Sequence, residues 1–330
     1  MSRPGGGAAR GLGAVAPRRD LHRRRRWALL LVLLGLVLAF LVAGWAARRA
    51  AVPHPGVIAM GEPPLVVAHQ GGNMLWPPNT RRAFDGAVAL GADALEMDVH
   101  LTADDVLIVL HDDTVDRTTD GEGPVSALAY DEVAALEAGD AWSPPGSKAT
   151  PFRGEGLRVP RLIDVLSDHP NVPLAIEIKP DGAAAASALC STLHAEGRTA
   201  DTVISSFHPD AMRAFRDACP EVATAAVERE VRLFLVLARL RLAGPYRPPF
   251  DALQVPARSG GIDVVTPAFV RAARAKDVPV HVWTVNEPAE MERLYELGVS
   301  GLITDRPDLA LRAAGRTPNG DALPPYIASD

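Results

Sequence analysis

The pattern of apolar and polar positions divides the chain into two unlike parts. From residue 65 onward, short β-branched runs alternate with segments rich in Ala, Leu, Glu and Arg. Strict alternation of this kind predicts parallel strands joined by crossover helices. We predict strands at 65–69, 94–98, 174–178, 202–206, 222–226, 252–255, 280–284 and 301–304, and helices at 80–90, 161–168, 183–196, 209–218, 230–242, 267–276 and 288–297. Eight such strands favour an α/β fold, the TIM (β/α)8 barrel.

One further apolar run, 106–110, falls outside that alternation. Only four residues separate it from the second strand run, too few for a parallel crossover of about a dozen residues. The two runs therefore form a predicted hairpin, and a turn centred on residues 104 and 105 places Asp98 opposite His111. The Gly-, Pro- and Asp-rich residues 112–156 that follow form a predicted insertion after the second barrel strand.

The chain before residue 64 has a different composition. An arginine-rich segment (1–26) precedes an uncharged apolar segment of 21 residues (27–47), long enough to span a bilayer as one transmembrane helix. Trp27 and Trp45 suit its two interfaces, and the arginines predict a cytoplasmic N-terminus with the rest of the chain outside the cell membrane. The alternative is a secreted protein with a cleaved signal peptide, because residues 44–46 resemble a cleavage site.

Composition and charge indicate how the rest of the chain is organised and which partners it excludes. A linker (48–63) is expected to lead into one barrel domain (64–315), followed by a tail (316–330). The net charge of −6 includes the arginine-rich leader, so the barrel is more acidic still. This argues against nucleic acid as a partner, which needs a basic surface. Two cysteines, Cys190 and Cys219, are expected to be separate buried thiols, with a disulfide as the alternative in an oxidising compartment.

Acidic residues gather where the strands are predicted to end, which is where barrel enzymes have their active sites. Glu96 and Asp98 are two apart in a strand and share a face, so their charges repel unless a cation lies between them. Glu177 ends the next barrel strand and is a candidate third ligand; the alternative is a salt bridge to Lys179. Carboxylate oxygens favour Mg²⁺ or Ca²⁺ over Zn²⁺.

Two histidines lie at neighbouring strand ends. His69 and His111 are the expected acid–base pair, because an imidazole can be neutral or protonated near neutral pH. The glycines at 71 and 72 allow a phosphate to approach the backbone, and Lys179 supplies positive charge for it. Trp283 is expected either to form a wall for an apolar or choline-like group, or to pack in the core.

Taken together, these motifs resemble those of the glycerophosphodiester phosphodiesterase (GDPD) family, in order over residues 65 to 310. The motifs are Ala68-His69-x-Gly71-Gly72, Asn79-Thr80, Glu96-x-Asp98, His111-Asp112, Glu177-x-Lys179, Trp283-Thr284-Val285-Asn286 and Gly301-Leu302-Ile303-Thr304-Asp305-x-Pro307. The resemblance implies a TIM barrel with an insertion, and a divalent metal held by Glu96, Asp98 and Glu177. It also implies that His69 and His111 act as general base and general acid, cleaving a glycerophosphodiester to glycerol 3-phosphate and an alcohol.

The chain departs from the family pattern at two positions. Gln70 stands where the family usually has arginine, and Pro78 where it has glutamate before Asn-Thr. Loss of the arginine removes a charge-assisted phosphate contact. Gln70 can still donate an amide hydrogen bond to the substrate, so we expect an active enzyme with altered substrate preference.

Two other functions fit the same sequence. One is lysophospholipase D activity on lysophospholipids near the anchor, and the other is a catalytically degenerate, membrane-tethered binding module. The leucine-rich, arginine-flanked stretch 231–243 is either a bilayer contact or simply an outer helix of the barrel. Retention of the acids and both histidines favours the enzyme.

Overall fold

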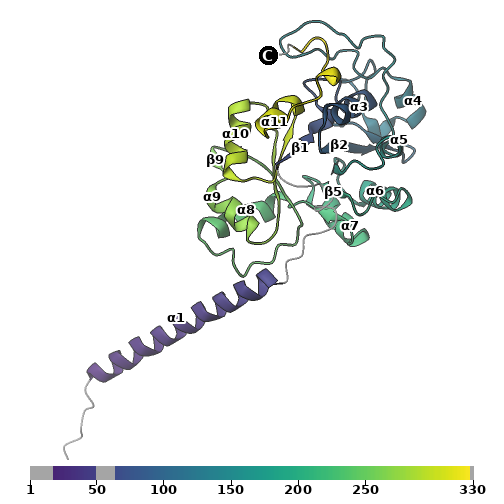
Figure 1. The fold of residues 1–330 in the computed structure, drawn as a ribbon. Coiled ribbons are helices and arrows are strands. Elements are labelled where there is room, and N and C mark those ends of the chain that lie inside the picture. Colours follow the sequence, from purple (N-terminus) through teal and green to yellow (C-terminus); the bar gives the residue numbers. More distant parts are fainter. Residues whose placement is uncertain (1–17, 50–63, 328–330) are drawn as a thin grey trace, which may run out of the picture.

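The structure is a computed structural model that describes residues 18–49 and 64–327. Helix α1 (Arg18–Arg49) forms a single long helix, and the remaining described elements form the barrel domain (Figure 1). Most of the apolar side chains described in α1, such as Trp27 and Leu31, are exposed. Among the described residues, no helix meets the length and apolarity that a membrane crossing requires. The transmembrane helix expected at 27–47 therefore stays a prediction.

The barrel wall is made of parallel strands. Within the described residues, eight strands pair in the order β6-β5-β4-β2-β1-β11-β10-β7. An isolated parallel bridge between Ala225 and Ala252 joins the two outer strands of this order, so the sheet curves back on itself. The strands are β1 (Leu65–Ala68), β2 (Ala94–Leu101), β4 (Leu174–Ile178), β5 (Thr202–Ser205), β6 (Ala223–Thr224), β7 (Leu253–Pro256), β10 (Val280–Trp283) and β11 (Gly301–Thr304). The predicted TIM-barrel-like α/β fold is confirmed.

Helices cover the outside of this wall. They are α3 (Arg81–Leu90), α5 (Leu162–Asp168), α6 (Ala183–Ala195), α7 (Pro209–Ala218), α8 (Glu228–Arg239), α9 (Pro267–Arg274), α10 (Pro288–Leu297) and α11 (Pro307–Ala313). Strand residues alternate between two buried clusters because successive side chains point to opposite faces. On β1, Val66 packs toward the helices, whereas Val67 joins an inner cluster that contains several alanines. Small inner residues leave room near the mouth for polar side chains.

The predicted hairpin is present, but its register is shifted by one residue. Strand β3 (Leu107–Val109) pairs antiparallel with β2, and Val99 faces Val109. Asp98 therefore faces Leu110, whose N–H donates to the Asp98 carbonyl at 3.0 Å, so the pairing with His111 was wrong. The reason is the loop: Asp105 has a φ of +61°, and a three-residue loop ending in a left-handed residue replaces the predicted two-residue turn.

The segment after β3 forms a small layer over one side of the barrel. It contains η2 (Val125–Ala127) and α4 (Tyr130–Ala135). Val115, Val125 and Val133 pack in a cluster of their own. Part of the C-terminal segment lies against the barrel as well, since the Tyr326 hydroxyl donates to the Leu75 carbonyl at 2.7 Å.

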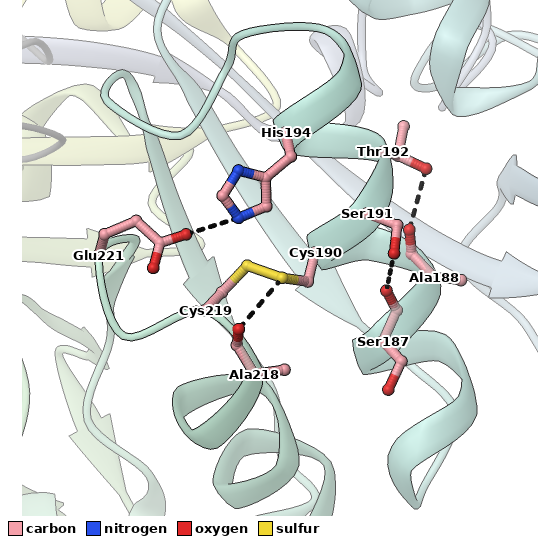
Figure 2. The surroundings of a disulfide bond; sticks show 9 residues. All are labelled: Ser187, Ala188, Cys190, Ser191, Thr192, His194, Ala218, Cys219 and Glu221. Carbon is pink, nitrogen blue, oxygen red and sulfur yellow. Dashed lines mark hydrogen bonds and ion pairs between the residues drawn. A yellow bond between two sulfur atoms is a disulfide. The ribbon is translucent and has the colours of Figure 1, made fainter.

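The two cysteines form a disulfide, which corrects the expectation of separate thiols. Cys190 of α6 and Cys219 at the end of α7 have Cα atoms 5.8 Å apart. Figure 2 shows that an ion pair spans the same two segments beside the disulfide, with His194 Nε2 2.8 Å from Glu221 Oε1. Neither helix position could be paired from sequence, because the distance between them depends on how α6 and α7 pack.

Candidate active site

Three carboxylates meet at the carboxyl ends of β2 and β4. Glu96 and Asp98 point to the same face of β2, and Glu177 of β4 is the register partner of Asp98. One oxygen of each acid lies within 4.8 Å of the others, which makes the trio a possible metal site. The structure thus brings together all three predicted ligands.

The surroundings of these acids favour a nearby positive charge. Burial, followed by the charge of Asp98, raises the pKa of Glu96 to about 8. Lys179 Nζ lies 3.0 Å from Glu177 Oε1 and 3.1 Å from Asp98 Oδ1, so the salt bridge weighed as an alternative is also present. Apart from this ion pair with Lys179, the buried Asp98 Oδ1 accepts no hydrogen bond from the residues that the structure describes. An all-oxygen donor set with such a buried oxygen fits a hard divalent cation.

His69 is held from one side by an aspartate that follows β11. Its Nδ1 donates to Asp305 Oδ1 at 2.6 Å, and its Nε2 lies 3.9 Å from Glu96 Oε2. Asn286 donates to the other Asp305 oxygen at 2.7 Å, which fixes the carboxylate. Burial disfavours the charged imidazole, but the surrounding carboxylates Glu96, Asp305 and Asp98 outweigh it and raise the pKa of His69 to about 9.

His111 is held in the same manner by a different aspartate. Its Nδ1 donates to Asp112 Oδ1 at 2.7 Å. Arg117 donates two hydrogen bonds, of 2.6 and 2.9 Å, to that carboxylate. They lower the pKa of Asp112 to about 2. The His111 carbonyl accepts a hydrogen bond from His100 Nε2 at 3.2 Å. Although His111 does not pair with Asp98, it directly follows Leu110, whose N–H donates to the Asp98 carbonyl, so it lies close to the acids of β2.

Gln70 contacts both acids of β2 rather than the open mouth. Its backbone N–H donates to Glu96 Oε2 at 2.8 Å, and its side-chain amide donates to Asp98 Oδ2 at 2.9 Å. Asn79 donates to the same Asp98 oxygen at 2.9 Å. Gln70 is buried, with a left-handed backbone at φ +53°, a conformation that costs a glutamine about 1 kcal/mol or more. Its strained backbone is what directs both donors at the carboxylates.

An aromatic pair lies at the same strand ends. Trp283 ends β10, and its ring meets that of Phe207 edge-to-face at 5.7 Å. The Phe207 side chain is largely exposed.

Beside the Asp112–Arg117 pair, a cavity of about 330 Å³ opens between the loop after β1 and the insertion, with Asn73, Met74, Arg117 and Trp142 among its lining residues.

Several functional contacts were missed by the sequence-based assignment. They involve Asp305, Asn286, Asp112, Arg117, Asn79 and Phe207. Most of them lie in the quoted motifs or just after a strand, so the available signal was their place at strand ends. The residue after Asn79 begins the next helix, because the hydroxyl of Thr80 caps α3 by accepting from the Ala83 N–H.

Comparison with known proteins agrees with this geometry. Residues 69–309 match the model of the glycerophosphoryl diester phosphodiesterase family. A glycerophosphodiester phosphodiesterase of Caldanaerobacter subterraneus subsp. tengcongensis is 34% identical over 251 residues, which are 74% of this chain and 95% of that protein.

Solved structures show the same fold. The crystal structure of a glycerophosphodiester phosphodiesterase from Agrobacterium tumefaciens aligns with a TM-score of 0.60 at 27% identity, covering 74% of this chain and 98% of that one. An Oleispira antarctica phosphodiesterase in complex with the product sn-glycerol-3-phosphate aligns with a TM-score of 0.57 at 22% identity, covering 76% and 96%. The chain therefore belongs to the glycerophosphoryl diester phosphodiesterase family, and its activity is that of a glycerophosphodiester phosphodiesterase.

Proposed function

We propose that the barrel mouth hydrolyses a glycerophosphodiester to glycerol 3-phosphate and an alcohol, with His69 and His111 as the acid–base pair. The observation that carries this is the matched setting of the two imidazoles. Asp305 and Asp112 each accept from an Nδ1 atom, which leaves both Nε2 atoms for proton transfer. The complex of the Oleispira phosphodiesterase with sn-glycerol-3-phosphate supports the same product.

The three acids are the proposed ligands of a divalent metal, Mg²⁺ or Ca²⁺. Glu96, Asp98 and Glu177 offer only oxygen atoms and lie close enough to share one ion. When bound, such an ion stabilises the negative charge that develops on the phosphate oxygens.

The remaining residues divide the work of the reaction. Lys179 adds a second positive charge beside Asp98 and Glu177 and attracts the phosphodiester. One histidine takes the proton of the attacking water or glycerol hydroxyl, and the other protonates the alkoxide oxygen as the bond between phosphorus and the alcohol breaks. After attack by a glycerol hydroxyl, a water opens the cyclic phosphate, so either route consumes one water and ends at glycerol 3-phosphate. Gln70 holds Glu96 and Asp98 in place. This differs from the substrate contact expected from sequence.

A lysophospholipid is the second candidate substrate. The observation in its favour is the exposed Phe207 ring against Trp283, which offers an apolar edge at the mouth. A choline group is also suited to such rings through cation–π attraction.

The location of the enzyme is part of the proposal and rests on the sequence. Segment 27–47 would anchor the chain in the cell membrane by a single pass, with the barrel outside. Alkaline carbonate extraction and N-terminal sequencing of the mature protein test this. An intact N-terminus in the membrane fraction supports the anchor, whereas a new N-terminus near residue 47 supports a secreted protein.

The activity is tested with the purified full chain on glycerophosphocholine, glycerophosphoethanolamine, glycerophosphoglycerol and lysophosphatidylcholine. We expect turnover that EDTA abolishes and that Mg²⁺ or Ca²⁺ restores. Asp85→Asn, which changes an exposed acid of α3, is a control that should keep full activity. Turnover that is unchanged by EDTA, or by His111→Ala, would contradict the mechanism.

A further inference from the structure

Helix α8 carries an exposed apolar stripe that the catalytic site does not use. Its inner side packs in the core through Phe234 and Ala238. On the outer side, Leu233, Val236 and Leu240 are 48%, 52% and 62% exposed, and their spacing of three and four residues puts them on one face. Most of stretch 231–243 is therefore part of an outer helix of the barrel, and the outer face of this helix is apolar.

Most of the exposed large apolar side chains of the barrel lie here. Among the described residues 64–327, seven such side chains are exposed, and five of them belong to this region: Leu233 and Val236 on α8, Leu240 and Leu242 just after it, and Ile262. Ile262 lies in the small hairpin of β8 (Arg258–Ser259) and β9 (Ile262–Asp263), which Arg239 joins to α8 by donating to the Asp263 carbonyl at 2.8 Å. We call these five residues the α8 patch.

The segment that contains α8 is rich in arginine, in an otherwise acidic chain. Residues 228–247 contain five arginines and two glutamates, a balance of +3, whereas the whole chain carries −6. All five arginines are exposed: Arg229, Arg232, Arg239, Arg241 and Arg247. Of the glutamates, Glu230 is buried and paired with Arg216, so it does not offset the arginines at the surface, whereas the exposed Glu228 pairs with Arg232.

We propose that the α8 patch docks on the surface of an anionic phospholipid bilayer. Exposed apolar side chains interspersed with exposed arginines match both layers of such a surface, since the former enter the acyl boundary and the latter meet lipid phosphates. The β8–β9 hairpin follows the carboxyl end of β7, so the α8 patch reaches from the outer face of α8 toward the end of the barrel where the catalytic residues lie. This contact is separate from the anchor proposed at 27–47 and does not depend on the catalytic activity.

The test places a reporter on the patch of the full chain. Val236→Cys is labelled with an environment-sensitive dye, and Ala89→Cys on α3 serves as the reference; the native cysteines are protected by their disulfide. Both proteins are incorporated into phosphatidylcholine vesicles with spin-labelled lipid, with and without phosphatidylglycerol. With the anionic lipid we expect quenching at position 236 to exceed that at position 89 at least about threefold, and to fall in high salt.

Variants separate lipid docking from other causes. Leu233→Ser with Leu240→Ser should reduce the excess quenching at position 236, whereas Ile163→Ser, which changes an exposed apolar residue on α5, should not. Equal quenching at positions 236 and 89 overturns the proposal. A dye signal that follows protein concentration and ignores lipid composition also overturns it, and identifies a second copy of the chain as the occupant.

Discussion

Gln70 donates hydrogen bonds to both acids of β2, Glu96 and Asp98. Its backbone N–H reaches Glu96, and its side chain shares an Asp98 oxygen with Asn79. The substitution Gln70→Leu keeps the bulk but removes one hydrogen bond to a charged carboxylate, an interaction of about 1.5–3 kcal/mol. We expect kcat to fall about 10-fold or more and the metal concentration for half-activation to rise similarly.

The kinetic pattern tells positioning from substrate contact. If Gln70 bound the substrate phosphate, Gln70→Leu would raise KM for every phosphodiester and leave metal activation unchanged. That result would contradict the role derived from the structure. A metal titration at saturating substrate, beside a substrate titration at saturating metal, provides both readings.

The Asp112–Arg117 pair makes a second residue-scale prediction. Asp112 orients His111 and keeps the proton on Nδ1, as an aspartate does in a catalytic triad. We expect Asp112→Asn to lower kcat about 100-fold or more. Arg117→Gln should have a smaller effect, about tenfold, because Asp112 remains to hold His111.

Arg153→Gln is a matched control for Arg117→Gln. Arg153 pairs with Asp140 at 3.0 Å on the same insertion, at an exposed position. Its loss should leave kcat within about twofold, as expected for a surface ion pair. Equal effects of the two arginine substitutions would show that Arg117 serves only the stability of the insertion.

Sequence identified the reacting groups better than the groups that hold them. The three acids and two histidines follow strongly apolar runs, so a barrel assignment alone brings them to one mouth. The contact between His69 and Asp305 joins positions 236 residues apart, and Asn286 adds a third strand end. Such contacts depend on the order of strands around the barrel, which spacing along the chain does not encode.

At the scale of elements, the disulfide links helices α6 and α7 covalently. It closes a loop of 29 residues between α6 and α7, and removing it should destabilise the fold by about 3–4 kcal/mol. Cys190→Ser with Cys219→Ser should therefore lower the urea midpoint markedly while activity at 25 °C persists, because no residue assigned to the active site lies on these two helices.

The neighbouring ion pair offers the control for that measurement. His194→Gln removes the contact with Glu221 but leaves the disulfide, and both side chains are about half exposed. We expect at most a small shift of the midpoint. A double-serine variant as stable as the wild-type protein would show that this link does not limit unfolding.

The apolar pattern predicted the two strands of the β2–β3 hairpin but not their register. The apolar runs located both strands, because their side chains alternate between buried faces. The register depends on a single backbone angle, the positive φ of Asp105, and an aspartate tolerates that conformation only somewhat better than most residues. A shift of one residue moved His111 beyond the ladder, where Asp112 holds it.

At the scale of the whole molecule, the barrel interior contains an unusual polar pair. His281 of β10 and Gln254 of β7 are register partners, and His281 is fully buried. Within the described part of the chain, neither ring nitrogen of His281 nor the Gln254 amide nitrogen has a hydrogen-bond partner. Burial lowers the pKa of His281 to about 4. The folded barrel therefore holds this imidazole neutral at a pH where an unfolded chain would protonate it.

This difference predicts acid sensitivity with a definite sign. An unfolded histidine binds its proton near pH 6.5, so between pH 6.5 and 4 the unfolded chain binds more protons than the folded chain and stability falls as the pH falls. A shift from 6.5 to about 4 corresponds to about 3 kcal/mol. His281→Leu should remove this loss, so urea midpoints of the variant and the wild-type protein should diverge as the pH is lowered from 7 to 4.

His169, which is also buried with a lowered pKa, provides the comparison in His169→Leu, since its Nε2 lies 3.3 Å from Asp85 and its burial is less complete. Parallel midpoint curves for wild type and His281→Leu would show that the interior histidine does not set the acid limit of the fold.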